Sequence, residues 1–439
     1  DGVAGAAGAA DAAGAEGSRA ITSVAIVGAG IAGATLARYL ARQMDSRGDA
    51  GALWVVLFER RAAPDGPDGG VLWLRSEARS VLEELGCLEA LEEAEADAAA
   101  AAGAVRGEGF YVARDFLMGL LLEGVGQRVE LRYNCEVVGV REGGGAVDVD
   151  SRPLLVLRDN EWFRNEDAGV QTDTFDLVVG ADGNAPSSRV ARGIVGDSAA
   201  RAEPVPLLVL QALAPCSSDA AEAAAAPVAQ EALLVAPGAG AGRLAVGAAV
   251  GRAGGDEASL STPSGQTRWE FCTVTVAQLD PMRNFPHPRL WAERMQQGIA
   301  QCQDDALRER AAAVLARAAC AAAPGRHGSN EGRLFSWVPF RKDSLERWRS
   351  NGGRLIALGD AAHLMPPTCG WGASCAMGDA RRLARVLAGL HGAAVGKGPS
   401  ADARLEAAFA EYESSRREAA AGPVADSVAE ADLLVNLSA

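Results

Sequence analysis

The stretch LIALGDAAHLMPPTCGWGASCAMGDA, residues 355–380, places an aspartate, a histidine and two cysteines around a Pro-Pro pair and a Gly-x-Gly sequence. A nucleophilic cysteine needs a nearby base. Cys369 and Cys375 have no histidine at a useful spacing, so we interpret them as small buried side chains. His363 is either a general base or a side chain packed beside a loop, and we favour packing. Trp371 either stacks on a bound ring or anchors the loop.

The backbone of the same stretch predicts a binding loop. The apolar run 354–358 indicates a buried strand that delivers Asp360 at its carboxyl end, where open α/β sheets bind ligands. Pro366 and Pro367 disfavour helix up to Gly370. The sequence from Gly370 to Ser374 then predicts the start of a helix, whose exposed amides favour negative charge.

A second motif, Gly28-Ala29-Gly30-Ile31-Ala32-Gly33, follows an apolar run that ends at Val27. The first glycine permits a tight turn, the second a close approach of backbone to a pyrophosphate, and the third close packing of helix on strand. The next apolar run, 53–59, ends in Glu59, a carboxylate suited to ribose hydroxyls. This strand–turn–helix–strand unit predicts a dinucleotide site and leaves NAD and FAD as alternatives.

A third motif, FDLVVGADGNAPSSRVAR at 175–192, is a buried strand that runs into Asp182-Gly183. Taken alone, Asp182 is a turn residue. Only together with the other two motifs does a cofactor role become the favoured interpretation.

Composition limits the function classes. The 439 residues carry a net charge of −15, which argues against nucleic acid or an anionic membrane as the main partner. Eight cysteines without a CxxC indicate reduced thiols, hence the cytoplasm or another reducing compartment, and a first residue other than Met leaves organelle import open. The four histidines lack metal-ligand spacing, so we expect no metal site.

The order of patterns predicts four segments. Residues 1–20 are rich in Ala and Gly and are interpreted as a disordered tail. Residues 21–200 together with 332–392 read as one discontinuous α/β domain, interrupted by a second domain at 201–331 with an antiparallel sheet followed by helices at 288–302 and 304–322. Helices are also expected over 75–98 and 115–122, and residues 401–439 form a C-terminal helical segment.

Taken together, the three motifs and GGVLWL at 69–74 resemble the FAD-dependent aromatic hydroxylases, the group A flavin monooxygenases. The pattern is most similar to the branch that contains tetracycline-inactivating monooxygenases. The resemblance implies a Rossmann-like (glutathione-reductase-type) FAD-binding domain with an inserted antiparallel β-sheet substrate domain and a C-terminal helix. It also implies non-covalent FAD, NAD(P)H as a transient co-substrate, O2, and a flavin C4a-hydroperoxide that hydroxylates or epoxidises an aromatic, polyketide-like or isoprenoid substrate.

The resemblance also implies roles for individual residues. Those expected around the FAD diphosphate and adenosine are Gly28, Ala29, Gly30, Ile31, Ala32, Gly33, Glu59, Arg60, Arg114, Val137, Asp182 and Asp360. Those expected near the isoalloxazine ring are Gly70, Val71, Pro367, Gly370, Trp371, Gly372, Ala373 and Ser374. No side chain is assigned as a catalytic acid or base, because the flavin carries the chemistry.

The sequence departs from the family pattern at three places. Pro186 and Ser374 stand where the family usually has Ser and Asn, and the segment between Leu88 and Arg114 is short and rich in Ala. These departures keep two alternatives open: a reductase or dehydrogenase of the same fold, and a flavoprotein with impaired turnover. An NAD-dependent dehydrogenase is disfavoured because the Asp360 loop has no role in that fold. The expected protein is a monomer or dimer without stable membrane insertion.

Overall fold

A computed structural model describes most of the chain between Ile21 and Leu437. The described ranges are 21–47, 53–62, 69–91, 109–141, 152–159, 171–183, 188–215, 230–236, 240–252, 266–278, 280, 282–321, 333–391 and 401–437. The expected tail at 1–20 and the departure at Pro186 lie outside these ranges.

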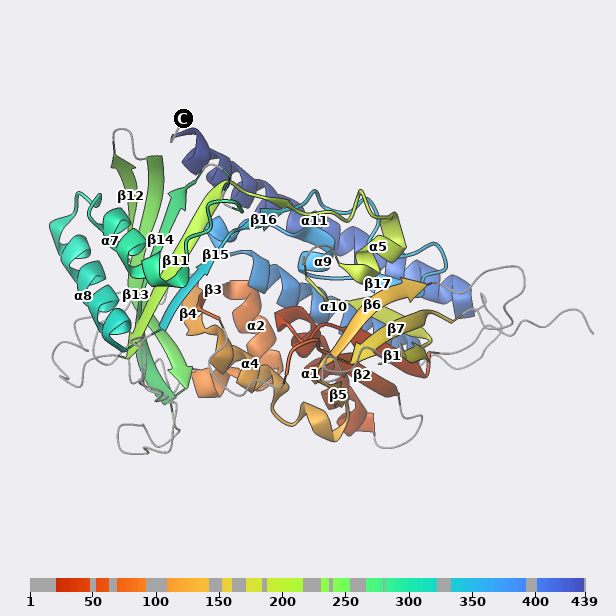
Figure 1. The fold of residues 1–439 in the computed structure, drawn as a ribbon. Helices are drawn as coiled ribbons and strands as arrows, with labels where there is room; N and C mark the ends of the chain where they lie inside the picture. The colour runs from red at the N-terminus through yellow and green to blue at the C-terminus, as the bar shows by residue number, and fades with distance from the viewer. Residues whose placement is uncertain are drawn as a thin grey trace, which may run out of the picture.

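A five-stranded parallel sheet, β17-β9-β1-β2-β5, forms the centre of one half of the molecule (Figure 1). Its strands are β1 (Ser23–Val27), β2 (Trp54–Phe58), β5 (Glu130–Arg132), β9 (Leu177–Gly180) and β17 (Leu355–Ala357). Every residue of β1, β9 and β17 is buried, as the near-continuous apolar runs predict for strands covered on both faces.

Helices complete this half. They are α1 (Ile31–Arg47), α2 (Ser76–Glu84), α4 (Arg114–Leu122), α5 (Arg189–Val195), α9 (Asp360–His363), α10 (Gly372–His391) and α11 (Ala401–Asn436). α1 packs against α10 and α4, and α5 packs against β9 and β17. A small antiparallel sheet of β6 (Cys135–Arg141), β7 (Leu154–Asp159) and β8 (Gln171–Thr174) lies beside α5.

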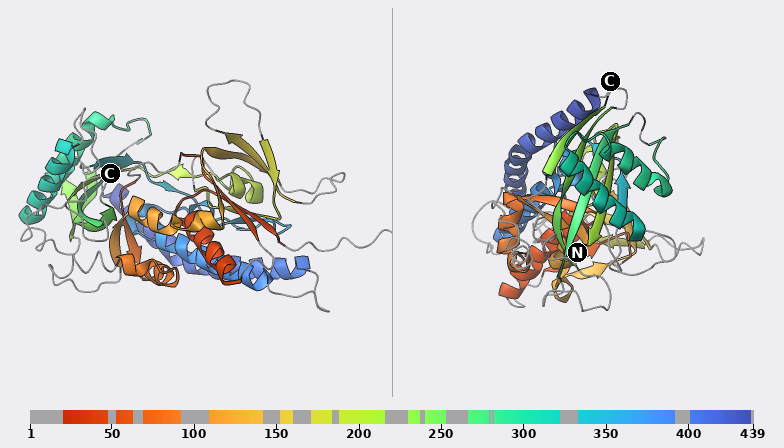
Figure 2. Two further views of the ribbon diagram at one scale, coloured as in Figure 1. Left: turned by 90° about the horizontal axis from the view of Figure 1, so that it is seen from below. Right: turned by 90° about the vertical axis from the view of Figure 1, so that its left-hand side faces the viewer.

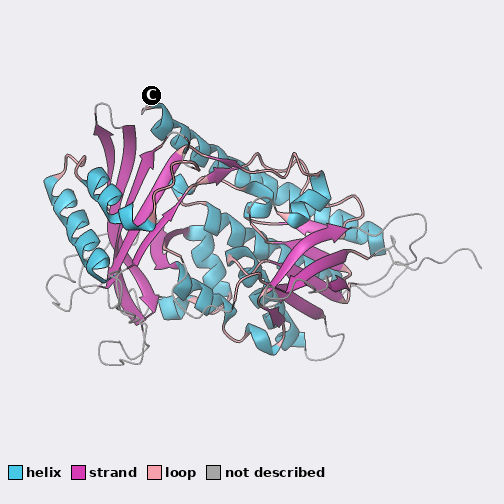
Figure 3. Ribbon diagram, viewed as in Figure 1, coloured by secondary structure: helices cyan, strands magenta, loops and turns pink. Residues whose placement is uncertain are grey.

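A seven-stranded sheet forms the other half, in the order β15-β11-β14-β13-β4-β3 with β12 paired to β13. Its strands are β3 (Val71–Arg75), β4 (Gly109–Ala113), β11 (Leu207–Pro215), β12 (Gln230–Ala236), β13 (Gly240–Arg252), β14 (Gln266–Ala277) and β15 (Arg333–Trp337). The helices α7 (Trp291–Ile299) and α8 (Asp305–Ala321) cover its outer face (Figures 1 and 3).

The alternation in β11 shows how the sequence determines the two faces of this sheet. Leu208, Leu210 and Ala212 join the core under α7 and α8, whereas Gln211 and Leu213 lie on the opposite face. Successive strand side chains point to opposite faces, so apolar residues on both faces give an uninterrupted buried strand.

α11 runs along the length of the molecule and touches both halves (Figures 1 and 2). The side chains of Phe409 and Tyr412 are buried against the first half, and Ala431 and Leu434 pack on Leu207 of β11. The remaining short elements are η1 (Val125–Gln127), β10 (Glu203–Pro204), η3 (Pro288–Leu290), β16 (Phe340–Arg341) and η4 (Pro367–Cys369).

The architecture confirms the expected α/β unit, antiparallel sheet and C-terminal helix, and corrects some details. The single helix expected over 75–98 is wrong, because α2 ends before Gly86, which adopts φ +67°, and residues from 92 to 98 are outside the description. The Pro-Pro pair does not exclude all helix, since a 3-10 turn forms at Pro367–Cys369. β3, β4 and β15 join the antiparallel sheet although the sequence placed them in the other domain, and the domain division as a whole stays a prediction.

Within the described residues, none of the helices is both long and apolar enough to cross a bilayer. Six cysteines in these ranges are free thiols: Cys87, Cys135, Cys272, Cys302, Cys369 and Cys375.

Asp176 fastens the start of β1 to the strand beside it. Its Oδ2 accepts hydrogen bonds from the backbone N–H groups of Thr22 (2.8 Å) and Ser23 (3.0 Å) and from both hydroxyls. Burial alone would raise the pKa of Asp176, but these hydrogen bonds outweigh it and hold the pKa below its usual value.

Replacing Asp176 by Ala is expected to lower the free energy of unfolding by about 2–3 kcal/mol, because buried donors lose a charged acceptor. The depressed pKa means that this contribution is present above the unfolded-state pKa of about 4 and is lost as the pH falls below it. Denaturant unfolding at pH 7 and at a series of pH values below about 4 measures both effects. As a matched control, Asp45→Ala removes a surface ion pair with Arg128 and should cost less than about 1 kcal/mol. Equal losses in the two variants would contradict the prediction.

Candidate cofactor site

The turn between β1 and α1 leaves no room for side chains at two of its three glycines. A Cβ on Gly28, which has φ +102°, would lie 2.4 Å from the carbonyl oxygen of Ala181, and a Cβ on Gly33 would lie 1.9 Å from that of Gly28. Around Gly30, in contrast, a Cβ would meet nothing within 4 Å. The turn is therefore tightly packed on the protein side and open at Gly30, beside the N-terminus of α1, as a cradle for a diphosphate requires.

Glu59 follows β2 and holds this turn. Its Oε2 accepts a hydrogen bond from the N–H of Ala29 at 3.0 Å, and its Oε1 accepts one from the N–H of Arg61 at 3.0 Å. The sequence-predicted carboxylate is thus brought to the glycine turn. Arg60 is exposed next to it, and Val137 is buried in β6.

Asp182 caps a helix. It accepts hydrogen bonds from the hydroxyl of Ser188 and from the N–H of Arg189, at the first turn of α5. Burial raises the pKa of its carboxyl above the usual value. Asp182 is therefore a turn residue that holds the start of α5. It follows Ala181, against which Gly28 packs, so its proposed role in binding the cofactor stays a prediction.

The Gly359–Asp360 turn adjoins the glycine turn. A Cβ on Gly359 would lie 3.1 Å from the Cβ of Ala32 and 3.2 Å from that of Ala376, so α1 and α10 close around it. Burial raises the pKa of Asp360, an effect that the charges of His363, Lys342 and Arg114 oppose.

Lys342 lies close to the turn at Asp360 and interacts with the carboxyl groups of both Asp360 and Asp182. Its Nζ donates to the carbonyl oxygens of Asp360 (3.2 Å) and Ala361 (2.6 Å). Burial lowers the pKa of Lys342 to about 8, although the Asp360 and Asp182 carboxyls act to raise it. The ammonium is therefore mostly charged at pH 7 and adds a cation beside a site suited to a diphosphate.

The start of β3 contacts β11 of the same seven-stranded sheet. The N–H of Val71 donates to Oε1 of Gln211 on β11 at 2.6 Å, and a Cβ on Gly70 would lie 1.8 Å from the same oxygen. The side chain of Arg114 packs against Gly69. The backbone N–H of Arg114 donates to the carbonyl oxygen of Gly70 at 2.9 Å. The structure therefore brings together three residues that the sequence predicted, namely Gly70, Val71 and Arg114.

The loop that leads into α10 is held by β3. The Oγ of Ser374, fully buried, accepts a hydrogen bond from the N–H of Arg75 at 2.9 Å. The guanidinium of Arg75 donates to the carbonyl oxygen of Cys369 at 2.7 Å and lies 3.9 Å from the ring centroid of Trp371. Gly370 packs against Trp73, where a Cβ would lie 2.9 Å from the ring. Ser374 thus has a structural role that explains a hydroxyl at this position.

The structure bears on whether His363 is a base or a packed side chain, and on whether the cysteines are nucleophiles. His363 is fully buried and its Nε2 lies 2.6 Å from Oδ2 of Asp379, so the packing interpretation agrees with its position. Burial raises the pKa of the Cys375 thiol to about 12, which disfavours a thiolate nucleophile. The described residues contain no group of three or more His, Cys, Asp or Glu arranged to hold a metal.

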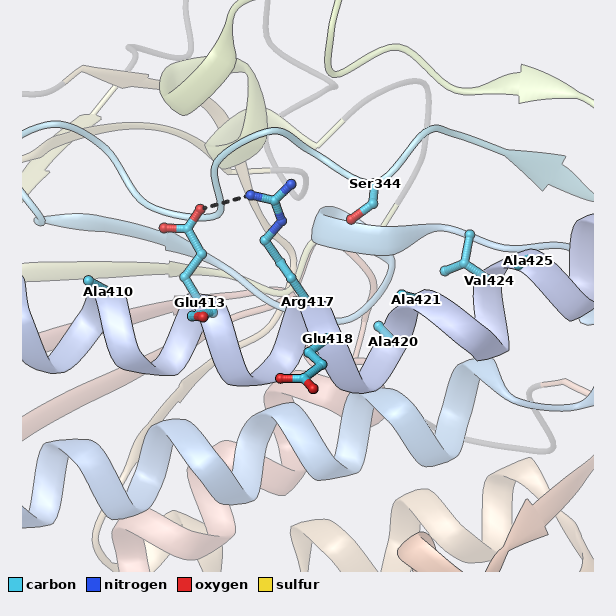
Figure 4. Close-up of a pocket in the computed structure, with 10 residues that line it drawn as sticks. Ser344, Ala410, Glu413, Arg417, Glu418, Ala420, Ala421, Val424 and Ala425 are labelled. Carbon is cyan, nitrogen blue, oxygen red and sulfur yellow. Dashed lines mark ion pairs between the residues drawn. The ribbon is translucent and has the colours of Figure 1, made fainter.

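A groove of about 610 Å³ lies elsewhere, along α11 (Figure 4). Its lining consists of Ser344 and a row of α11 residues that includes the Glu413–Arg417 ion pair. None of the predicted cofactor residues lines it, so this groove is separate from the site built above.

Four contributors escaped the sequence analysis: Arg75, Gln211, Lys342 and Asp379. Gln211 is a lone polar residue in an apolar strand and could have been singled out as a buried polar residue that needs a partner. Lys342 stands among several arginines, so the sequence does not mark it as the buried cation. Arg75 and Asp379 give no such signal, because each lies in a helix-like pattern of mixed charge.

The fold and the site define a dinucleotide-binding α/β protein with an attached antiparallel sheet. The open side of Gly30, the N-terminus of α1 and the Glu59 carboxylate fit the diphosphate and ribose of FAD.

The comparisons identify the family. The model of the FAD binding domain matches residues 21–426, and the chain belongs to this family, whose cofactor is FAD. The FAD-dependent monooxygenase phnB of Penicillium herquei is 31% identical over 116 residues, which cover 24% of this chain and 27% of the relative. The match therefore spans about a quarter of the curated relative's length.

Solved structures share the fold. CtdE in complex with FAD and substrate 4 superposes with a TM-score of 0.61 at 18% identity, covering 94% of this chain and 90% of CtdE. The tetracycline destructase Tet(51) gives a TM-score of 0.56 at 14% identity, covering 94% of this chain and 92% of the destructase.

Gly30→Ala tests the placement of the diphosphate. The added methyl group meets no protein atom, so the FAD-free protein should unfold at the wild-type denaturant concentration. If the diphosphate lies over Gly30, the Kd for FAD should rise about tenfold or more, or about 1.4 kcal/mol. Fluorescence titration of the FAD-free protein measures the change.

Gly389→Ala is the matched control. Gly389 is an exposed position of α10 where a Cβ also meets nothing within 4 Å. This variant should keep the wild-type Kd for FAD. A wild-type Kd in Gly30→Ala would show that the diphosphate lies elsewhere.

Proposed function

We propose that the protein is an FAD-dependent monooxygenase. It uses NAD(P)H and O2 to hydroxylate or epoxidise a small organic substrate that is aromatic, polyketide-like or isoprenoid. Membership of the FAD binding domain family and the likeness to a curated FAD-dependent monooxygenase support the reaction class.

One observation carries the proposal. Arg75 joins the loop at the start of α10 to the edge of the seven-stranded sheet, through its N–H to Ser374 and its guanidinium to Cys369 and Trp371. A cofactor held by the Gly28–Gly33 turn and the Asp360 turn would therefore extend toward the inner face of that sheet. This geometry suits a cofactor whose reactive ring meets a substrate on a sheet surface.

The residues proposed to hold FAD are those that the resemblance implied, with distinct roles for each group. The amides at the N-terminus of α1 bind the diphosphate, and Glu59 binds the ribose. Asp360 binds the ribityl–diphosphate region with Lys342 and Arg114 nearby. The backbone of Val71 and the amides that begin α10 at Gly372 face the isoalloxazine and favour negative charge there.

FAD supplies the redox chemistry when it is bound, and the chain supplies orientation and a dry surface. Trp73, Tyr111 and Phe271 lie in a row on the inner face of the sheet, with successive ring centroids 4.5 Å and 4.6 Å apart. Burial raises the pKa of the Tyr111 hydroxyl, which therefore stays protonated at neutral pH. We propose that this aromatic wall faces a flat, apolar substrate and excludes water from it.

The other expectations become part of the proposal. The unit of residues 21–200 and 332–392 is proposed to bind FAD, and 201–331 to form the substrate domain, completed by β3, β4 and β15. The free thiols agree with a reducing compartment such as the cytoplasm. A monomer or dimer remains the expected assembly.

Purified protein should show the absorbance bands of oxidised flavin, and denaturation should release the flavin because it is bound without a covalent bond. With a panel of phenolic, polyketide and isoprenoid compounds, at least one should accelerate NADH or NADPH oxidation more than about tenfold over the rate without substrate. The oxidation should require O2, and mass spectrometry should find one atom of ¹⁸O from ¹⁸O2 in the product.

The outcomes separate the alternatives. NAD(P)H oxidation that proceeds without O2 and yields a reduced or desaturated compound would instead establish a reductase or dehydrogenase. A protein that binds FAD but never consumes NAD(P)H with any compound would be the impaired flavoprotein.

A further inference from the structure

The turn that precedes Asp360 depends on a contact from outside the strand that enters it. Gly359 adopts φ +59° and ψ −141°, a conformation reserved for glycine, and its N–H points away from any sheet partner. The N–H donates instead to Oδ2 of Asp379 on α10 at 2.9 Å. A helix side chain 20 residues further along the chain therefore holds the backbone of the proposed cofactor turn.

The carboxylate of Asp379 is fully buried and accepts three hydrogen bonds. Besides the N–H of Gly359, Nε2 of His363 lies 2.6 Å from Oδ2, and Nε of Arg416 donates to Oδ1 at 2.7 Å. Burial would raise the pKa of Asp379, but the charges of His363 and Arg416 and their hydrogen bonds hold the pKa below its usual value. The carboxylate is thus ionised and saturated with donors.

Arg416 brings the C-terminal helix into this network. It lies on α11, and besides Asp379 it donates through Nη1 to Oε1 of Glu77 on α2 at 3.0 Å and through Nη2 to the carbonyl oxygen of Cys375 at 3.1 Å. The side chain of Arg416 is 9% exposed, so its charge is compensated inside the protein. α2, α10 and α11 therefore meet at one guanidinium.

His363 completes the network on the other side of the turn. Its ring centroid lies 5.1 Å from that of Trp348, and the backbone N–H of Trp348 donates to Oε1 of Glu413 on α11 at 3.0 Å. α11 therefore reaches the Gly359–Asp360 turn by two routes, through Arg416 and Asp379 and through Glu413, Trp348 and His363.

We propose that Asp379, with His363 and Arg416, is a positioning unit that sets the backbone of Gly359 and Asp360 for FAD. Through this unit α11 determines how tightly and in what environment the flavin is held. The inference rests on the proposed placement of FAD at Asp360, and Asp379 and Arg416 act through the turn rather than by touching the cofactor.

Asp379→Asn is the direct test. The amide keeps the shape of the carboxylate but puts an NH2 group against Arg416 or His363, so the three donors can no longer all be satisfied. The Kd for FAD should rise about tenfold. At saturating FAD the visible absorbance bands of the bound flavin should change shape or position, because the ring lies in an altered environment.

Arg416→Gln is the second variant. It leaves Asp379 in place but removes the donor to its Oδ1, so the Kd for FAD should rise about threefold to tenfold, with a band change in the same direction. Arg416→Lys restores a cation and should recover part of the wild-type affinity.

Two controls separate positioning from general destabilisation. Glu77→Gln weakens the outer partner of Arg416 but leaves every contact of Asp379, so the Kd and the bands should stay at wild-type values. Glu270→Gln disrupts a partly buried carboxylate, paired with Arg317 and Arg310 on α8, and should lower stability without changing the bound flavin.

The outcomes distinguish this inference from the proposed function. If wild-type protein does not bind FAD, or if Gly30→Ala keeps the wild-type affinity, the cofactor placement itself fails. If wild-type binds FAD and Gly30→Ala weakens it, but Asp379→Asn and Arg416→Gln behave like Glu270→Gln, only the positioning role is overturned. Failure of both variants to fold would assign the network to folding and would also overturn the inference.

Discussion

Backbone segments approach one another unusually closely at the carboxyl ends of β1, β9 and β17, and the rest of the site depends on this contact. A Cβ on Gly28 would lie only 2.4 Å from the carbonyl oxygen of Ala181, and a Cβ on Gly359 would lie 3.1 Å and 3.2 Å from the Cβ atoms of Ala32 and Ala376. Two strand-to-helix connections therefore share one small volume. Such contact brings the amides of α1 and the carboxylate of Asp360 to the same edge of the sheet, where parallel α/β proteins bind ligands.

The apolar core of the parallel sheet continues into the edge of the seven-stranded sheet. Leu74 of β3 and Val112 of β4 belong to the same buried cluster as the strands of the parallel sheet, whereas the side chains under α7 and α8 form a separate cluster. Within the seven-stranded sheet, Gln211 of β11 accepts from the N–H of Val71 and donates through Nε2 to the hydroxyl of Thr273 at 2.8 Å. These hydrogen bonds fix the position of β3 relative to β11, because hydrogen bonds weaken steeply when misaligned.

α11 adds a second connection between the halves. Arg243 on β13 donates to the carbonyl oxygen of Thr368 at 3.2 Å and pairs with Glu430 on α11. The hydroxyl of Thr368 in turn donates to the carbonyl oxygen of Ser427 at 2.8 Å. The loop that precedes α10 is thus held between a strand of one half and the helix that spans both.

Local patterns in the sequence predicted the parts of the fold that local physics decides. The glycine turn, the Glu59 carboxylate and the strand before Asp360 follow from spacing and apolar runs, and all three lie together. The helix expected over 75–98 was too long, because the spacing of its leucines continues past Gly86, where the backbone turns left-handed. Pairing of β4 with β13, and the contacts of Ser374 and Asp379, join residues far apart in the chain. A single sequence carries no local sign of such partners, so these features required the structure.

The alternation along β11 commits nine consecutive residues to two separate sets of contacts. Leu208, Leu210 and Ala212 pack against the helices behind the sheet, so a change there alters the packing of α7 and α8. Leu213 packs with Phe271 on the opposite face, where Gln211 holds the N–H of Val71, so a change there alters the position of β3. Neighbouring residues of one strand therefore control two separate parts of the molecule.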